Sequence, residues 1–383
     1  MKILVCPDSF KGTLTSFQAC KAIEKGLKQA GVKASDITLH PTADGGDGTI
    51  DALLRTTKSI VIKTNVQNSY GKIRSAKLLQ LDNNTVFIEA SEACGIIYTP
   101  IKYRKPLNLS TFGVGQLIKK ALDLKIKNIY IGVGGSSTND GGIGMAGALG
   151  LRLFDKDNKE IRSDKNGYTP LSLDNFAHIN IDNLDKRIKN VQIIVCSDVK
   201  NSLLGDKGAS KVYGPQKGAS KKEIIKLEKL LTNLNNVCKK DLKIDLNQIV
   251  GGGASGGLGA ALVGFLKAEI RPGLNEIAKL TKLIEKIKEA DIIITGEGCM
   301  DEQTSFDKTP FAILKIAKQF NKSVYGLSGF LKKSPGGFDK VYGTNNLVDF
   351  DEMKIGENAS QMLSSLGAKF ANEVLNLNLK RSK

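Results

Sequence analysis

The sequence predicts an α/β fold in which both chain ends build one parallel-sheet domain, with a second, mixed α/β domain inserted between them. Short apolar runs alternate with helix-spaced segments near both termini. From about residue 60 to 90, three strand-like runs follow one another without a helix, and glycine-rich loops then dominate to about residue 260. Because alternating strands and helices are typical of parallel sheets, we expect one domain from 1–65 and 285–383 and another from 66–284.

The elements of the outer domain follow from local signals. A strand at 2–6 precedes a helix whose start carries a capping box, Thr15 with Gln18, and whose end is marked by Gly31. A strand at 37–39 leads through PTADGGDGT to a helix from about 50 to 57. ADIIITGEG, SVYGLSG and KVYGT predict later strands, separated by helices at 310–320 and 359–375.

Residues from about 60 to 90 contain three successive strand-like runs, SIVIKTNV, KLLQL and TVFIEAS, with no helix between them. Glycine-rich loops follow to about residue 260. A mixed second domain inserted into the first would explain why the alternating strand and helix pattern is found on both sides of this different stretch.

Composition limits the function classes. The 383 residues are 41% hydrophobic and 25% charged, as in ordinary globular proteins, and no apolar run is long enough to span a bilayer. The net charge of +17 suggests a nucleic-acid binder, but 48 lysines and only eight arginines are scattered along the chain, and tryptophan is absent. We favour a solvated surface, keep a nucleic-acid binder and an anionic small substrate as alternatives, and expect a cytoplasmic protein without a membrane partner.

Cysteine and histidine usage excludes other chemistries. The six cysteines form no CxxC pair, which fits a reducing compartment, and two histidines support neither a zinc site nor a Ser-His-Asp hydrolase. Two GxGxxG matches, at 142–147 and 251–256, lack the acidic residue about 20 positions on that a dinucleotide site needs. A dinucleotide-dependent oxidoreductase is therefore the weakest of the alternatives.

Chemistry-bearing side chains gather in six glycine-rich segments, most of them directly after a predicted strand. Glycine lets backbone amides approach an anion, and ligand loops of open α/β sheets follow the carboxyl ends of strands. The segments are CPDSFKG at 6–12, TADGGDGT at 42–49, GVGGSSTNDGGIG at 132–144, residues 196–219 from CSDVKN to KGA, GGGASGGLGAAL at 251–262, and TGEGCMDEQ at 295–303.

Several of these segments allow two interpretations. Asp8 and Lys11 suit substrate binding, or a turn beside a surface lysine. Asp44 and Asp47 suit a hydrated Mg²⁺, although Asp47 also fits a helix N-cap. The segment at 132–144 favours a phosphate cradle over structural turns, whereas the run at 251–262 is equally consistent with close helix packing and with an anion loop.

The remaining segments add carboxylates and lysines. Asp198 follows a strand and is a candidate base or metal ligand, Lys217 could neutralise phosphate oxygens, and Glu297 with Asp301 repeats the paired-carboxylate pattern. Together the six segments indicate phosphoryl transfer, which depends on positioning and on charge stabilisation by Mg²⁺, lysines and backbone amides.

At these residues the chain resembles the type I glycerate kinase family. The matching strings include PDSFKGTL, TADGGDGT, GVGGSSTNDGG, LLGDKGASKVYGPQKGAS and ITGEGCMDEQT, in order along nearly the whole chain. The resemblance implies a flavodoxin-like outer domain and ATP- and Mg²⁺-dependent phosphorylation of D-glycerate to 2-phospho-D-glycerate by a monomer or homodimer, with a related hydroxy acid as the alternative substrate. Where the family usually has arginine and glycine, this chain has Cys299 and Asp307.

The resemblance places these motifs at the active site, and within it we expect the following roles. The expected set is Asp198, Lys11 and Asp8 in catalysis; Ser9, Asp44, Lys217 and Gln303 in substrate binding; Gly134, Gly135, Ser136, Ser137, Asn139, Asp140 and Lys308 in ATP binding; and Asp47, Glu297 and Asp301 in Mg²⁺ binding.

Overall fold

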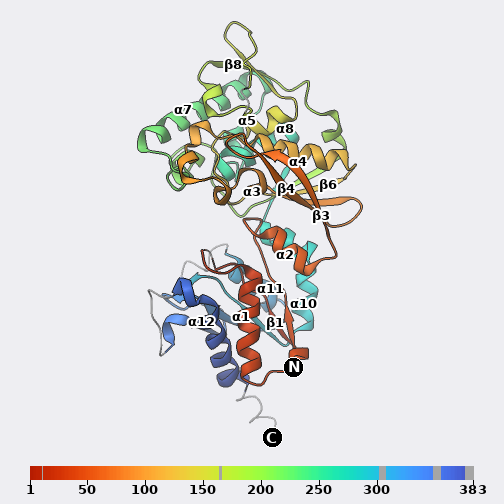
Figure 1. Cartoon of the computed structure of the whole chain (residues 1–383), viewed down its shortest axis with the longest axis vertical. Helices are drawn as coiled ribbons and strands as arrows, with labels where there is room; N and C mark the ends of the chain where they lie inside the picture. Colours follow the sequence, from red (N-terminus) through yellow and green to blue (C-terminus); the bar gives the residue numbers. More distant parts are fainter. Residues whose placement is uncertain (11, 164–165, 302–307, 348–354, 376–383) are drawn as a thin grey trace. The chain divides into compact units, whose positions relative to one another are not determined.

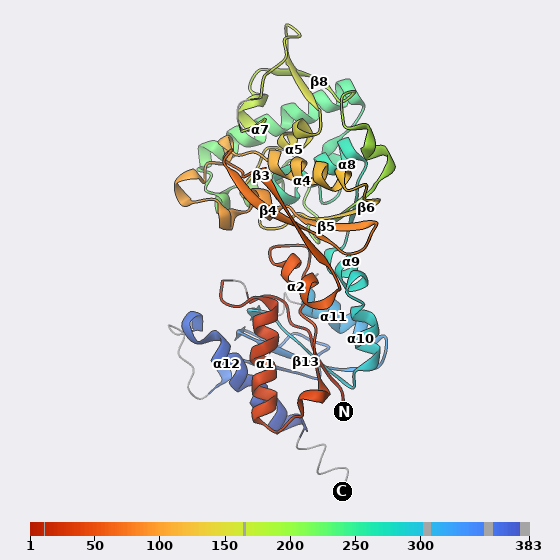
Figure 2. The same ribbon diagram turned by 45° about the vertical axis from the view of Figure 1, so that its right-hand side comes forward.

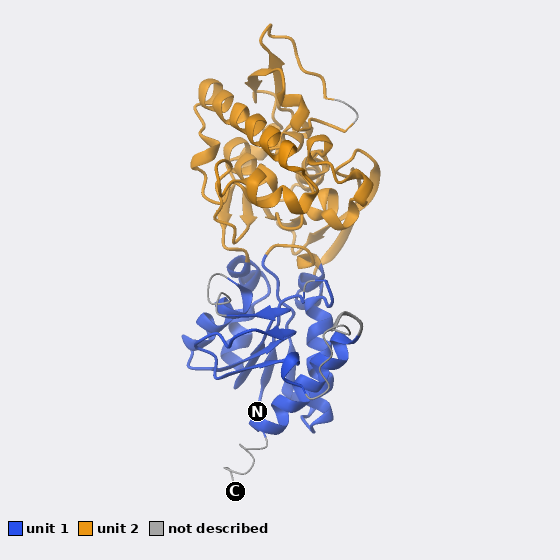
Figure 3. Ribbon diagram, turned by 90° about the vertical axis from the view of Figure 1, so that its left-hand side faces the viewer, with its two compact units in different colours: residues 1–44, 51–57, 274–383 blue, residues 45–50, 58–273 orange. Residues whose placement is uncertain are grey.

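Two units, each assembled from separate stretches of chain, make up the structure (Figure 3). The computed structural model describes residues 1–10, 12–163, 166–301, 308–347 and 355–375. Unit 1 comprises Met1–Asp44, Asp51–Thr57 and Leu274–Lys383, and unit 2 comprises Gly45–Ile50 and Lys58–Gly273. The sequence placed the boundaries at 65/66 and 284/285; the contacts place them at 57/58 and 273/274, and assign six residues of an early loop to unit 2.

Unit 1 is built on a five-stranded parallel sheet. Its order, β15-β13-β11-β1-β2, becomes 5-4-3-1-2 when these strands are numbered along the chain, which is the flavodoxin-like order. The predicted fold class is therefore confirmed for this unit. The strands are β1 (Ile3–Val5), β2 (Ile37–Leu39), β11 (Ile292–Thr295), β13 (Ser323–Ser328) and β15 (Lys340–Gly343).

Helices cover both faces of this sheet (Figures 1 and 2). Ile3 and Val5 pack with the helices of one face, and Leu4 packs with those of the other, because successive strand residues point to opposite sides. The first face carries α1 (Ser16–Gln29) and α12 (Ile355–Phe370), and the second carries α9 (Gly273–Leu280), α10 (Leu283–Glu289) and α11 (Thr309–Lys318). A short pair, β12 (Cys299–Met300) with β14 (Phe330–Leu331), completes the unit.

The predicted local signals of unit 1 are confirmed. The Thr15 hydroxyl accepts the amide N–H of Gln18 at 3.2 Å, and the Gln18 side chain accepts the amide N–H of Thr15 at 2.8 Å, so the capping box is formed. The helix predicted at 310–320 is α11, with Pro310 in its first turn, where its missing N–H costs nothing. The helix predicted near 50–57 is α2 (Thr49–Thr56), which begins in unit 2 and ends in unit 1.

Unit 2 is built on a six-stranded mixed sheet of order β10-β9-β6-β5-β4-β3. The strand pairs β3–β4 and β4–β5 are antiparallel, and β5, β6, β9 and β10 are parallel. The expected mixed α/β domain, inserted into a parallel-sheet domain, is therefore confirmed. The strands are β3 (Ile60–Gln67), β4 (Ile73–Gln80), β5 (Thr85–Glu89), β6 (Asn128–Gly132), β9 (Gln192–Cys196) and β10 (Glu269–Arg271).

One large core holds unit 2 together, and Figure 2 shows its helices packed over the sheet. The helices are α3 (Ser91–Cys94), α4 (Phe112–Asp123), α5 (Ile143–Ala148), α6 (Ala209–Tyr213), α7 (Lys221–Val237) and α8 (Leu258–Leu266). The strands β7 (Arg152–Asp155) and β8 (Phe176–Asn180) form a separate antiparallel pair. All six cysteines are free thiols. Within the described ranges, no helix is long and apolar enough to pass through a lipid bilayer.

Candidate active site

In unit 1, predicted site residues line one cavity of about 460 Å³. Asp8 and Ser9 follow β1, Asp44 lies in the loop after β2, and Glu297 follows β11; Lys308 precedes α11. The strand order reverses direction between β1 and β11, and open α/β sheets bind ligands at such a point, outside the carboxyl ends of the strands. The cavity therefore lies where this fold places its ligand.

The loops that form this cavity are tied to one another by backbone contacts. The Asp8 amide donates to the Gly296 carbonyl at 2.8 Å, which joins the loop after β1 to the loop after β11. The Thr295 hydroxyl donates to the Cys6 carbonyl at 3.0 Å and reinforces the same junction. The short sequence strings PDS and GEG are thus held side by side, although about three hundred residues separate them along the chain.

Charge in the cavity is mixed. The Lys308 ammonium lies 3.2 Å from Glu297 Oε1 and also donates to the Cys299 carbonyl at 3.4 Å. Asp8 and Asp44 bring two further carboxylates, and Asp8 accepts the Ser9 amide at 2.6 Å. Among the described residues, the cavity therefore offers several hydroxyl acceptors and the Lys308 ammonium. Lys308, expected among the ATP ligands, thus lies among the residues expected to bind substrate.

Apolar side chains form part of the cavity wall, beside three threonines. Phe10, Met362 and Leu363 line it, the last two from α12, and Cys299 stands beside them. Because the family usually has arginine in place of Cys299, this wall carries one cation fewer than the resemblance implies.

In unit 2, three of the predicted segments come together at the carboxyl ends of β6 and β9. A Cβ atom on Gly45 would lie 2.7 Å from the Cys196 carbonyl oxygen, and one on Gly132 would lie 2.3 Å from the Gly45 oxygen. A Cβ atom on Gly135 would lie 1.8 Å from a carboxylate oxygen of Asp47. Real Cβ atoms do not approach other atoms so closely, and Gly45 and Gly135 also have positive φ angles of 90° and 70°. Glycine is therefore required at Gly45 and Gly132, where a Cβ atom would meet backbone, whereas a Cβ atom at Gly135 would displace the Asp47 carboxylate.

A buried carboxylate that was not predicted from the sequence also binds this cluster. Glu89, the last residue of β5, is 5% exposed and accepts the amides of Gly48 at 3.1 Å and Ile50 at 2.9 Å. Burial raises the pKa of the Glu89 carboxyl, and these hydrogen bonds oppose the rise. The only available signal was an acidic residue ending the fully buried run TVFIE.

The segment predicted to cradle phosphate has a half-buried part and a buried part. Gly134 and Gly135 are half-buried, whereas the residues from Ser136 to Asp140 are all buried. The Asp140 carboxylate accepts the Thr111 amide and hydroxyl at 2.7 and 2.8 Å and the amides of Gly142 and Gly144 at 3.0 and 3.3 Å. The Asp140 carboxylate therefore binds backbone amides at the starts of α4 and α5 within unit 2.

Two other side chains of the buried part also bind protein groups. Ser137 donates to the Cys94 carbonyl at 2.9 Å, and the Asn139 amide donates to the Ser210 hydroxyl at 2.9 Å. The half-buried backbone of Gly134 and Gly135 is thus supported by a hydrogen-bonded layer, and the expected contact of this layer with ATP remains a prediction.

Lys217 is part of the same buried layer. It is 2% exposed, and its ammonium donates to the Ser136 hydroxyl at 3.0 Å and the Thr138 carbonyl at 2.6 Å. Burial lowers the pKa of Lys217 to about 8, and the charge of Asp140 opposes this change only in part. Lys217 therefore ties the segment around residue 217 to the loop after β6.

Replacing Lys217 with methionine is expected to change how stability depends on pH. The unfolded lysine binds its proton up to its ordinary pKa, about 10.4, whereas the folded lysine releases it near 8, so wild-type stability gains with pH between these values. We expect the free energy of unfolding of the wild type to rise by about 2 kcal/mol relative to Lys217→Met between pH 7 and 10. Urea titrations of both proteins across this range measure it, and a constant difference would contradict a buried, titrating lysine.

Asp198 lies at the carboxyl end of β9 and is half-buried. Its Oδ1 accepts the amide of Gly273 at 3.0 Å, at the start of α9. One oxygen thus fixes the carboxylate relative to the backbone. A position just beyond a strand end is where a base or a ligand of a reacting group is expected.

The run at 251–262 is explained by close packing. A Cβ atom on Gly256 would lie 2.2 Å from the Thr138 carbonyl oxygen, and one on Gly257 would lie 2.7 Å from the Gly141 Cα. The Ala260 amide, in the first turn of α8, donates to the Gly252 carbonyl at 3.0 Å. Of the two interpretations left open by the sequence, the packing favours a structural run beneath the 132–144 segment.

The other expected residues are distributed as follows. Asp47 lies in unit 2, whereas Glu297 and Asp301 lie in unit 1, and Asp301 directly follows β12. Lys11 and Gln303 lie outside the described residues, as does Asp307. Across the described part of the chain, His, Cys, Asp and Glu side chains form no ready-made group of three that could hold a metal ion.

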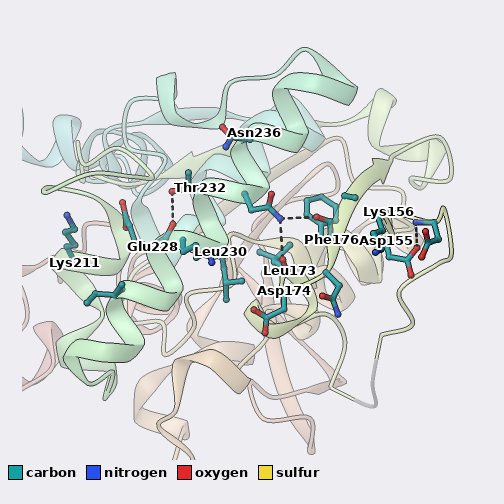
Figure 4. Close-up of a pocket in the computed structure, with 16 residues that line it drawn as sticks. Asp155, Lys156, Leu173, Asp174, Phe176, Lys211, Glu228, Leu230, Thr232 and Asn236 are labelled. Carbon is teal, nitrogen blue, oxygen red and sulfur yellow. Dashed lines mark hydrogen bonds between the residues drawn. The ribbon is translucent and has the colours of Figure 1, made fainter.

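A larger hollow of about 1210 Å³ lies elsewhere in unit 2 (Figure 4). It is lined by residues of α7, such as Glu228, and of the β7–β8 pair, such as Asp155 and Phe176. None of the residues expected at the site lines it. The larger hollow is therefore not the candidate active site. The predicted site residues of unit 1 line the smaller cavity.

Comparison with known proteins identifies the family. The glycerate kinase family model matches residues 3–374. Glycerate 2-kinase of Escherichia coli is 39% identical over 89% of this chain and 90% of its own length, and glycerate kinase of Halalkalibacterium halodurans is 39% identical over 89% and 87%. A crystal structure from Salmonella typhimurium LT2, of a protein provisionally named glycerate kinase 2, matches with a TM-score of 0.83 and 36% identity over 100% of both chains. The chain therefore belongs to the glycerate kinase family.

Proposed function

We propose that this protein transfers the γ-phosphoryl group of ATP to the 2-hydroxyl of D-glycerate and releases 2-phospho-D-glycerate. Membership of the glycerate kinase family and relatives named glycerate kinase support the proposal. The observation that carries it is the cavity of unit 1, which combines the carboxylates of Asp8 and Asp44 with the Lys308 ammonium. Carboxylates accept hydrogen bonds from hydroxyls and an ammonium donates to a carboxylate, so this set suits a small hydroxy acid.

We assign substrate binding to this cavity. Asp8, Ser9 and Asp44 would bind the hydroxyls of glycerate, and Lys308 would bind its carboxylate. Lys11 stays predicted as a catalytic residue, and Gln303 stays predicted as a partner of the substrate.

We assign the phosphates of ATP to the half-buried backbone of Gly134 and Gly135 in unit 2. Amides of glycine loops bind phosphate oxygens because no side chain blocks their approach. The buried layer of Ser136, Lys217 and Asp140 would act by holding these glycines in place. This assignment separates the residues that touch the nucleotide from those that support the loop.

Mg²⁺ would enter with ATP and offset the charge of its phosphates. The proposed ligands, Asp47, Glu297 and Asp301, provide the carboxylate oxygens that this ion prefers, and Mg²⁺ usually needs only one or two carboxylates besides water. The chemistry of the available donors therefore fits the ion.

The reaction needs a carboxylate to orient the attacking hydroxyl. The hydroxyl oxygen of glycerate forms a bond to the γ-phosphorus, the bond from that phosphorus to the ADP oxygen breaks, and the hydroxyl proton passes to the carboxylate. We propose Asp198 for this carboxylate, with Asp8 orienting the substrate. Because little covalent chemistry is required of the protein, positioning and charge stabilisation account for most of the expected acceleration.

The direct test is ATP turnover by the purified protein with Mg²⁺ and D-glycerate. We expect ADP release only when D-glycerate is present, and phosphorus NMR of the product should show 2-phosphoglycerate. L-Glycerate and lactate are the comparison substrates, since a preference for either would indicate a related hydroxy acid instead. Failure of all three to stimulate ATP turnover would overturn the proposed function.

A further inference from the structure

Glu89 makes a set of contacts that connects β5 to the DGGDGT loop. Its Oε1 accepts the Gly48 amide and the Ser91 hydroxyl, at 3.1 and 2.8 Å, and its Oε2 accepts the Ile50 amide at 2.9 Å. Gly48 and Ile50 flank Thr49, the first residue of α2. The first amides of a helix have no partner within the helix, and a charged acceptor binds them more strongly than a neutral one.

The segment that Glu89 holds is unusual in its position along the chain. Gly45–Ile50 belongs to unit 2, whereas the residues before and after it, Met1–Asp44 and Asp51–Thr57, belong to unit 1. The loop must therefore be attached to unit 2 by contacts of its own. Gly45 packs on Cys196 and Asp47 packs on Gly135, and the buried Glu89 carboxylate adds hydrogen bonds to the amides of Gly48 and Ile50.

These contacts determine where the Asp47 carboxylate lies. Asp47 directly precedes Gly48, whose amide Glu89 binds, and the Asp47 carboxylate lies against the backbone of Gly135. Without Glu89, the buried amide of Ile50 and the more exposed amide of Gly48 lose their acceptor, and the loop gains freedom to move Asp47 away from Gly135. Displacement of a reacting or metal-binding group by about 1 Å can slow an enzyme by as much as 10²-fold.

We propose that Glu89 is a positioning residue for phosphoryl transfer, which acts by holding the Gly45–Ile50 loop and its Asp47 carboxylate in the reactive arrangement. The proposal rests on the proposed function, since it concerns the same reaction. Glu89 itself touches protein groups, and it differs in this respect from the residues assigned to substrate or nucleotide.

The chain offers a matched control for Glu89. Glu92 is also 5% exposed and lies three residues further along, but it faces Arg74 and Lys77, with its Oε1 3.7 Å from the Lys77 ammonium and its Oε2 accepting the Lys77 amide at 3.1 Å. Glu89→Gln and Glu92→Gln therefore remove the same charge at the same burial. Only Glu89→Gln weakens the hydrogen bonds to the Gly45–Ile50 loop. Gly48 and Ile50 bind different oxygens of Glu89, and glutamine replaces one of these oxygens with an NH₂ group that cannot accept.

The experiment compares both variants with the wild type in three measurements. Loss of a residue that orients a ligand typically costs 10- to 100-fold, so we expect Glu89→Gln to lower kcat by about 10- to 100-fold and leave the KM for D-glycerate within about twofold. Hydrogen exchange of the peptide that contains residues 45–50 should become faster in Glu89→Gln and stay unchanged in Glu92→Gln. On an Asp47→Asn background, Glu89→Gln should add less than about threefold, because both changes disturb the same group.

The outcomes separate the two proposals. A wild type that does not phosphorylate glycerate contradicts the proposed function, whatever the variants do. An active wild type with equal kcat losses in Glu89→Gln and Glu92→Gln, or with effects of Glu89→Gln and Asp47→Asn that simply multiply, overturns the role of Glu89. If Glu89→Gln does not fold, Glu89→Asp replaces it, since aspartate keeps the charge and cannot reach both amides.

Discussion

Replacing Asp198 with asparagine is expected to slow glycerate phosphorylation by about 10²- to 10⁴-fold, the usual contribution of a positioned proton acceptor. Asparagine is isosteric and its Oδ1 can still accept the Gly273 amide, so the start of α9 stays capped. Only the ability to take the hydroxyl proton is lost. Initial rates with saturating ATP and D-glycerate measure kcat, and thermal melting checks the fold.

The control for this change is Asp245→Asn in the same unit. Asp245 also caps a short helix, because its Oδ1 accepts the Asn247 amide at 3.1 Å, and it belongs to none of the six glycine-rich segments. We expect its kcat to stay within about twofold of wild type. An Asp198→Asn variant that keeps more than a tenth of wild-type kcat would show that another carboxylate, with Asp8 the first candidate, accepts the proton.

Replacing Gly135 with alanine is expected to lower kcat by about 10²-fold with little loss of stability. The new Cβ would lie 1.8 Å from the Asp47 carboxylate, so this carboxylate has to move. The group that moves is the end of a side chain, and a left-handed alanine costs only about 1–2 kcal/mol, so the midpoint of thermal unfolding should fall by only a few degrees.

Gly31→Ala is the control that distinguishes displacement of the Asp47 carboxylate from the strain of an alanine with a positive φ angle. Gly31 has a φ angle of 92°, and a Cβ atom there would meet nothing within 4 Å. It shares the strain of Gly135→Ala without any displaced carboxylate, so its melting temperature should fall by a similar amount while kcat stays near wild type. Equal kcat values in the two alanine variants would show that Asp47 tolerates displacement, which would also weaken the argument for Glu89.

Much of the architecture was predictable because its signals are local. The capping box at Thr15, the apolar runs of β11 and β13, and the three successive strands from residue 60 were all visible in short windows of sequence. The order of the unit 1 strands was less accessible, since pairing of Ile3 with Ile292 involves residues far apart in the chain. There the resemblance to a family supplied what periodicity could not.

The site was only partly predictable, because burial and hydrogen-bond partners depend on distant residues. Glycine, serine and aspartate after a strand suggested that Ser136 and Asp140 face a phosphate, and the fold buries them. Lys217 looked like a cation for a ligand and donates to Ser136 and Thr138 instead. Glu89 was missed because its contacts cross 39 to 41 positions of sequence, and no short motif records them.

The discontinuous make-up of unit 1 has a consequence for the order in which the chain acquires its structure. During synthesis β1 and β2 emerge first, and the next strand of their sheet, β11, begins only at Ile292. All of unit 2 after Gly45–Ile50 is made in the interval, as Lys58–Gly273, and can fold while the first two strands wait with an open edge. We therefore expect completion of the unit 1 sheet to be a late, non-local and slow step, during which the open edge can pair with another chain.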